Sequence, residues 1–205
     1  MTTFLLVRHA SHDLLGKALA GRAPGILLNE RGRAEADQLA DRFAHIRLAR
    51  IYTSPRERAR DTAAPLGKRL RLTPLVNGSI DEIDFGLWTG LSFSELQRDP
   101  GWRIWVETRS VGQAPRGEAF ADVQRRVIAG LGCLRTEHPA ETIALFTHGD
   151  VIKAALAYFL HMSLDNLEGF DIAPASVSAI ATEGGWAQVQ LVNGAGPRPL
   201  AALAP

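Results

Sequence analysis

Four residues of this 205-residue sequence could act together on one charged ligand: Arg8, His9, Arg58 and His148. Each guanidinium offers a planar fork of donors and keeps its charge near neutral pH, so two of them suit a phosphate dianion. A neutral imidazole nitrogen beside that phosphate could attack phosphorus and form a phosphoramidate. The leaving oxygen would then need a proton from an acid. Three carboxyl groups in one short segment are candidates: Asp81, Glu82 and Asp84.

The expected secondary structure shows how these residues could meet. Short apolar segments predict three buried strands, over residues 4–7, 49–53 and 142–146. Arg8 and His9 follow the first strand, Arg58 lies in the first turn of the helix after the second, and His148 follows the third. The carboxyl ends of parallel strands share one edge of the sheet, where ligands gather. We therefore expect the arginines and histidines to meet at that edge.

The remaining pattern alternates helices with strands. It predicts an α/β fold, a three-layer sandwich with a mostly parallel central sheet and helices on both faces. Asn29 is expected to cap a helix reaching Phe43, and Ser54-Pro55 is expected to start another. The helix after Ser54-Pro55 is expected over residues 56–70, and further helices are expected over 93–97, 102–108, 118–137 and 151–160. An edge strand is expected over 72–76, because Pro74 cannot donate to a ladder, and a hairpin over 177–182 and 187–192.

We expect a single domain over residues 1–192, with an inserted cap around 91–120 and a loosely ordered tail over 193–205. Lys and Arg total 23 against 22 Asp and Glu, a net charge of +1, which disfavours binding to nucleic acid or acidic lipid. The sequence contains no apolar segment of membrane-spanning length. A single cysteine, Cys133, excludes an internal disulfide, and it is expected at a buried position of a helix in a packing role. A cytoplasmic location follows as the expectation.

Five segments, in this order along the chain, resemble the histidine phosphatase superfamily in its phosphoglycerate mutase-like branch 1. The Arg-His-Gly signature stands here as Arg8-His9-Ala10, and the Ser-His-Gly signature as Thr147-His148-Gly149. The other three segments are Asn29-Glu30-Arg31-Gly32, Ser54-Pro55-Arg56-Glu57-Arg58-Ala59 and Glu82-Ile83-Asp84-Phe85-Gly86-Leu87-Trp88-Thr89-Gly90. One tripeptide is weak evidence, but an ordered set that spans residues 4–160 is specific.

The resemblance implies a role for each matching residue. His9 would be the phosphorylated nucleophile, and Glu82 the general acid and base. Three residues would hold the phosphoryl oxygens: Arg8, Arg58 and His148. It also implies a phosphoglycerate mutase-like fold and a phosphatase that hydrolyses small phosphomonoesters without a cofactor or metal. The expected partner is a small phosphorylated metabolite, with no nucleic acid and no membrane; a homodimer is left open.

The departures from the family pattern concern substrate contacts. Ala10 replaces a glycine, and Ser11-His12-Asp13 replaces residues such as Glu-Thr. Substrate contacts are expected from Ser11, Arg22 and Gly149, although an ordinary solvated arginine is an equal interpretation of Arg22. The segment over 91–120 is short compared with that of the mutases, which favours a phosphatase.

Other interpretations stay open. One is phosphoglycerate mutase-type phosphoryl transfer, and another is a catalytically silent module that binds phosphate esters. A metal-dependent hydrolase would use His9, His12, Asp13 and His148, although the arginines oppose a cation. Several further side chains are interpreted as surface or packing residues: Arg56, Arg60, His45, His138 and His161 at the surface, and Trp88, Trp102 and Trp105 in a lid or the core.

Overall fold

The computed structural model describes residues 1–195 and contains one six-stranded sheet over that range. The strands are β1 (Thr2–Arg8), β2 (Arg50–Thr53), β3 (Leu75–Val76), β4 (Thr142–Thr147), β5 (Val177–Glu183) and β6 (Trp186–Gly194). The α-helices are α1 (Glu30–Arg42), α2 (Glu57–Leu70), α3 (Phe93–Leu96), α4 (Pro100–Glu107), α5 (Phe120–Glu137) and α6 (Gly149–Phe159). Short 3-10 turns are η1 (Gly78–Ile80), η2 (Gly86–Trp88) and η3 (Leu164–Gly169).

The strand order is β3-β2-β4-β1-β5-β6. The pairs β3–β2, β2–β4 and β4–β1 are parallel, while β5 and β6 add an antiparallel hairpin beside β1. The parallel strands β2, β4 and β1 therefore lie side by side and end at the same edge of the sheet. This confirms the expected α/β fold, with a mostly parallel sheet between two helical layers.

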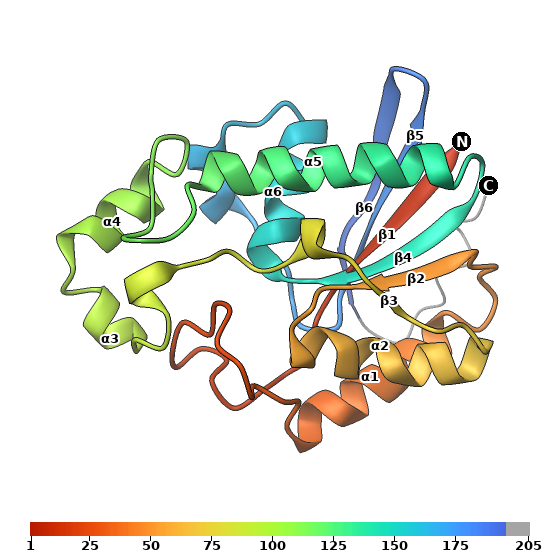
Figure 1. The fold of residues 1–205 in the computed structure, drawn as a ribbon, viewed down its shortest axis with the longest axis horizontal. Coiled ribbons are helices and arrows are strands. Elements are labelled where there is room, and N and C mark those ends of the chain that lie inside the picture. The colour runs from red at the N-terminus through yellow and green to blue at the C-terminus, as the bar shows by residue number, and fades with distance from the viewer. Residues whose placement is uncertain (196–205) are drawn as a thin grey trace.

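Both faces of the sheet are covered, which explains why its central strands are apolar without alternation. Leu5 and Val7 of β1 pack with α1 and α2, whereas Phe4 and Leu6 pack with α5 and α6. Figure 1 shows these two helix pairs on opposite sides of the sheet. Burying one such side chain fully contributes about 1.5–3 kcal/mol.

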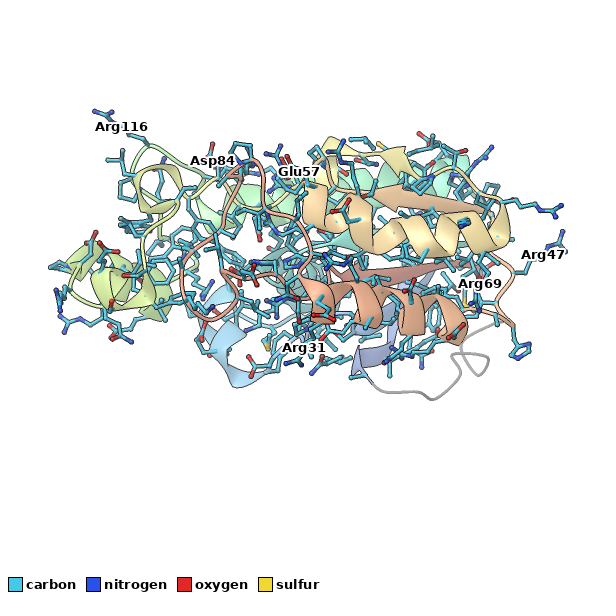
Figure 2. All side chains as sticks on the ribbon, turned by 90° about the horizontal axis from the view of Figure 1, so that it is seen from below. Arg31, Arg47, Glu57, Arg69, Asp84 and Arg116 are labelled. Carbon is cyan, nitrogen blue, oxygen red and sulfur yellow. The ribbon has the colours of Figure 1, made fainter. Side chains whose placement is uncertain are left out.

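Local signals set the ends of the helices near the sheet edge. The Asn29 side chain accepts a hydrogen bond from the Gly32 N–H and caps α1, as expected. Helix α2 begins at Glu57, and the Ser54 hydroxyl accepts from the Arg56 N–H before it. Polar side chains cover the outer side of this layer, where Figure 2 shows Arg31 and Arg69 extending from α1 and α2.

An aromatic cluster joins the segment around α3 and α4 to the main body. Trp88 and Trp105 are buried, and the Trp88 indole N–H donates to Asp99 Oδ2 at 2.8 Å. The Trp102 ring packs edge-on against Trp88, with ring centroids 5.3 Å apart. This confirms that the tryptophans serve packing. Arg116 extends outward from the same end of the molecule (Figure 2).

Three expectations from the sequence need correction. Cys133 is exposed, because it lies off the apolar stripe by which α5 packs. His138 is buried, since its ring contacts Tyr52 and Glu141. Strand β6 continues to Gly194, past the expected start of the tail, and residues 196–205 lie outside the described range. No helix among the described residues is long and apolar enough to cross a membrane.

Two glycines of α5 give opposite predictions for stability. A Cβ at Gly130 would lie 2.1 Å from Ser79 Oγ and 2.5 Å from Ser79 Cβ, whereas a Cβ at Gly132 would meet nothing within 4 Å. We expect Gly130→Ala to lower the free energy of unfolding by about 1–3 kcal/mol through overpacking against η1. Gly132→Ala should raise it by about 0.5–1 kcal/mol, because alanine loses less backbone entropy in a helix. Chemical denaturation of both variants tests this, and a gain in stability at both positions would contradict the close packing of α5 on η1.

Candidate active site

The pairing of β1 with β4 places two histidines next to each other. Arg8 pairs with Thr147 in the last register position of these parallel strands, so the residues that follow both leave the same edge. The His9 N–H donates to the Thr147 carbonyl at 2.8 Å. The rings of His9 and His148 then lie with their centroids 5.2 Å apart, and both are buried. The expected convergence of these two segments is observed.

Arg58 enters the same region from the first turn of α2. Its side chain is fully buried, and Nη2 donates to the Gly21 carbonyl at 2.8 Å. The same nitrogen lies 3.1 Å from His148 Nδ1 and 3.4 Å from Glu82 Oε2. Arg58 therefore links the loop after β1 to the second histidine and the acidic segment.

The acidic segment is held in place through its backbone. The Arg22 and Arg126 guanidiniums both donate to the Glu82 carbonyl, at 2.8 and 3.1 Å. Upstream, the Thr147 hydroxyl donates to the Ile80 carbonyl at 2.7 Å. These bonds leave the Glu82 carboxylate free to face Arg58 and His148, and its Oε2 lies 3.3 Å from Nδ1 of that histidine.

The two neighbouring acids have other contacts. Asp81 Oδ1 accepts from the Ser54 hydroxyl and from Arg56 Nε, at 3.1 and 3.0 Å. Asp84 Oδ1 accepts from the Gly86 N–H at 2.9 Å. Of the three candidate acids, Glu82 is therefore the one whose carboxylate lies among the histidines and Arg58.

Hydrogen bonds identify the protonated nitrogen of each imidazole. His9 Nδ1 lies 2.9 Å from the Ala10 carbonyl, which can only accept, so Nδ1 carries the proton and Nε2 keeps its lone pair. Ser54 donates to Asp81 and so accepts from His148 Nε2 at 2.8 Å. His148 Nδ1 is then an acceptor for Arg58.

Burial and the nearby charges shift the pKa values of these groups. Desolvation, with Arg58 and other cations nearby, holds the pKa of His9 and of His148 well below the ordinary value of 6.5. Both imidazoles are therefore neutral near pH 7. Desolvation raises the pKa of Glu82 to about 7, although Arg58 and Arg8 oppose this shift. Glu82 can therefore both give and take a proton near neutral pH.

The donor set at this edge suits an anion. Arg8 Nε, Arg58 Nε and Arg58 Nη1 are buried and have no hydrogen-bond partner within residues 1–195. Leaving a buried donor unpaired costs about 1–3 kcal/mol, more for a charged group. Unpaired guanidinium nitrogens can only donate, so they suit an anion with several acceptor oxygens. Gly149 begins α6 beside Arg8, where a Cβ would lie 3.4 Å from Nε, so the positive end of this helix also faces the arginine.

A cation fits the same residues poorly. Donor atoms of His9, Glu82 and His148 lie within 4.8 Å of one another, a spacing that a metal ion could bridge. However, the guanidinium of Arg58 contacts both Glu82 and His148 and would repel the ion. The residues present therefore favour an anion over a metal.

The other residues expected to contact substrate have different surroundings. The Ser11 hydroxyl donates to Glu35 Oε1 at 3.0 Å, so it serves to anchor its loop. Arg22 binds Glu118 Oε2 at 2.9 Å as well as the Glu82 carbonyl, so it is not an ordinary solvated arginine. Arg56, expected at the surface, is half-buried against Asp81, whereas Arg60 is exposed.

Sequence reasoning missed two residues that support the site. Ser54 is buried and connects His148 to Asp81, although the sequence identified it only as the start of a helix. Thr62 accepts from the Ala10 N–H at 2.9 Å and donates to the Arg58 carbonyl at 2.6 Å. Ser54 opens the matched segment that ends at Ala59, which was the available signal for it, whereas Thr62 lies three residues beyond that segment on α2.

Comparisons with known proteins find relatives that match most of this chain. Bifunctional protein Rv2228c of Mycobacterium tuberculosis is 34% identical over 209 residues, covering 95% of this chain but 54% of that protein. The chain therefore spans about half the length of this relative. Phosphoserine phosphatase 1 of Hydrogenobacter thermophilus is 31% identical over 188 residues, which is 89% of this chain and 88% of that protein.

A solved structure shows the same fold. YhfR of Bacillus stearothermophilus superposes with a TM-score of 0.89 and 31% identity, and the match covers 96% of this chain and 99% of that one. The sequence pattern of the histidine phosphatase superfamily, branch 1, matches residues 4–194. The chain belongs to the histidine phosphatase superfamily, branch 1.

Proposed function

We propose that this protein is a phosphatase that hydrolyses small phosphomonoesters through a covalent phosphohistidine on His9, with Glu82 as general acid and base. One observation carries the proposal: the lone pair of a buried, neutral His9 lies among arginine nitrogens that have no partner within residues 1–195. Such a site combines a nucleophile with donors for a phosphoryl group.

In the first step His9 Nε2 attacks phosphorus. The P–N bond forms while the bond from phosphorus to the ester oxygen breaks, and the protonated Glu82 gives its proton to the leaving alcohol. Arg8 and Arg58 hold the phosphoryl oxygens through nitrogens that have no partner within residues 1–195. His148 accepts from Arg58 and donates to Ser54 in this structure, so it joins them as a donor only in the tautomer that carries its proton on Nδ1. The two arginines balance the charge spread over those oxygens, which is the main task of a phosphoryl-transfer site.

The second step releases phosphate. Water attacks phosphorus, the P–N bond breaks, and the ionised Glu82 takes a proton from the water. His9 recovers its lone pair and Glu82 its proton, so each turnover begins from the same state. A pKa of about 7 suits both roles, because the carboxyl group is then populated in both forms near neutral pH.

The substrate and setting belong to the same proposal. The relative from Hydrogenobacter thermophilus is named a phosphoserine phosphatase, which supports hydrolysis rather than phosphoglycerate mutase-type transfer. We propose a small phosphorylated metabolite as substrate, a mechanism without metal or cofactor, and a cytoplasmic setting. A mutase would instead depend on a bisphosphate primer, and a silent binding module would take up phosphate esters without forming a phosphoenzyme.

His9→Ala should lower the rate of phosphate release from an aryl phosphate by at least about 10³-fold, because no other group there supplies the lone pair. After reaction with a ³²P-labelled ester and rapid quenching without acid, the wild type should carry an acid-labile phosphoryl label. The variant should carry none. His45→Ala, a matched change at an exposed histidine, should leave both readouts unchanged. Near-normal turnover by His9→Ala would reject the nucleophile. A wild type that binds phosphate but forms no phosphoenzyme would indicate the silent module.

Glu82→Gln should slow hydrolysis most for esters of weakly acidic alcohols, which need a proton on the leaving oxygen, and less for activated aryl esters. In the wild type kcat/KM for the alkyl esters should fall above about pH 7, as Glu82 loses its proton, and the variant should lack this decline. The measurement is a pH–rate profile for a series of esters with graded leaving groups. Equal losses across the series would remove Glu82 from proton transfer.

The pKa of Glu82 also predicts how stability depends on pH. Between about pH 4.5 and 7 the folded protein keeps a proton on Glu82 that the unfolded chain has lost, so stability falls as pH rises. Relative to Glu82→Gln, the wild type should lose up to about 1.4 kcal/mol of unfolding free energy per pH unit in this window. Urea unfolding of both proteins over this range provides the comparison. Parallel curves would show that the pKa of Glu82 is not raised.

A further inference from the structure

His12 is a buried histidine that the mechanism above leaves without a task. It is only 5% exposed, and its ring centroid lies 5.2 Å from that of His9. Its Nδ1 is buried and finds no hydrogen-bond partner within the described part of the chain. A buried polar atom without a partner is costly, so its retention beside the nucleophile indicates that a ligand completes its bonding.

The loop that carries His12 is anchored on both sides of it. Before it, the Ser11 N–H donates to Glu35 Oε2 at 2.9 Å, and the Ser11 carbonyl accepts from the Asn29 N–H at 3.2 Å. After it, Asp13 Oδ1 accepts from the Asn29 side chain at 3.1 Å. Glu35 of α1 and its N-cap Asn29 thus hold the backbone at Ser11 and the side chain of Asp13, one on each side of His12.

Burial and the neighbouring charges set the protonation state of the His12 imidazole. Desolvation, followed by Arg58 and Arg8, lowers the pKa of His12 to about 4. His12 is therefore neutral at physiological pH and offers one N–H donor and one acceptor nitrogen. A neutral ring can lie next to the two arginines without adding repulsion.

The unpartnered atoms of this region identify the ligand class. Besides Nδ1 of His12, six buried nitrogens lack a hydrogen-bond partner within residues 1–195. Three of them belong to the arginines of the site, Arg8 Nε, Arg58 Nε and Arg58 Nη1, and the others belong to Trp105 and Arg109. Guanidinium nitrogens can only donate, so a ligand shared with them presents acceptor oxygens. The tautomer of His12 that pairs with the same oxygens carries its proton on Nδ1.

We propose that His12 is a further phosphoryl-binding residue, whose Nδ1–H donates to an oxygen of the phosphoryl group carried first by the substrate and then by His9. This inference rests on the proposed function in that it assumes a phosphoryl ligand. It also assigns His12 a task other than ligating a metal. Because the contact is with the phosphoryl group, it serves all phosphomonoesters alike and does not select the alcohol.

The test is direct binding of inorganic phosphate, measured by calorimetry at pH 7.5. His12→Ala should weaken binding about tenfold or more, as expected for loss of one hydrogen bond to a charged group. His12→Asn, whose side-chain amide can place an N–H close to Nδ1, should restore most of the affinity. The exposed His45→Ala variant should bind phosphate like the wild type. An unchanged affinity in His12→Ala would overturn the proposal, as would a loss that asparagine does not restore.

A second measurement uses the wild type alone, and so does not depend on the folding of any variant. Nitrogen-15 NMR of the imidazoles should show His12 with a protonated Nδ1 whose resonance shifts when phosphate is added. No shift on saturation with phosphate would reject the contact.

Kinetics separate this inference from the proposed function. His12→Ala should raise KM by the same factor for esters of different alcohols, and a factor that varies with the alcohol would make His12 a leaving-group contact and reject the proposal. A different outcome is that the wild type hydrolyses no ester, while the His12→Ala variant binds phosphate more weakly than the wild type. The proposed function would then fail, and His12 would remain a phosphoryl ligand.

Discussion

The guanidinium of Arg58 lies fully buried beside the ends of the central strands, and its charge acts on His9, His148 and Glu82. Desolvation, reinforced by Arg58, lowers the pKa of His9 and keeps that imidazole neutral. Arg58 also opposes the desolvation that raises the pKa of Glu82. A buried charge is stable only with partners. Gly21, His148 and Glu82 occupy one of its nitrogens, and the remaining two have no hydrogen-bond partner within residues 1–195.

The hydrogen bonds that fix the position of Glu82 are made by its backbone carbonyl, and different groups surround its carboxylate. Glu82 is fixed through its backbone carbonyl by Arg22 and Arg126, and these arginines are themselves paired with Glu118. Its carboxylate is therefore positioned without being neutralised by those arginines. This arrangement explains how a carboxyl group next to a guanidinium can still have a raised pKa: its desolvation outweighs the opposing effects of Arg58 and Arg8.

Three side chains of the site follow strands whose backbone pairing is regular up to their last residues. Ser54, His9 and His148 each follow one of three adjacent parallel strands, and hydrogen bonds continue the ladder for Ser54 and His9 beyond the last paired residues. Such a rigid base suits a site whose catalytic effect comes from preorganised donors. The loop after β1 contributes His12 to the same region, anchored by α1 rather than by the sheet.

The sequence by itself determined the central strands, the helix starts and the residues that meet at the sheet edge, because burial on both faces and helix capping leave local patterns along the chain. The apolar stripe of α5 even contained the information that Cys133 is exposed, since Leu131 and Leu134 are on the buried face. Only the tertiary structure decided that His138 is buried, that Arg22 is held by acids, and that Glu82 rather than Asp81 or Asp84 faces the histidines. In each of these cases the partners come from distant segments, and neither hydrogen-bond pairing nor desolvation across such separations leaves a periodic signal in the chain.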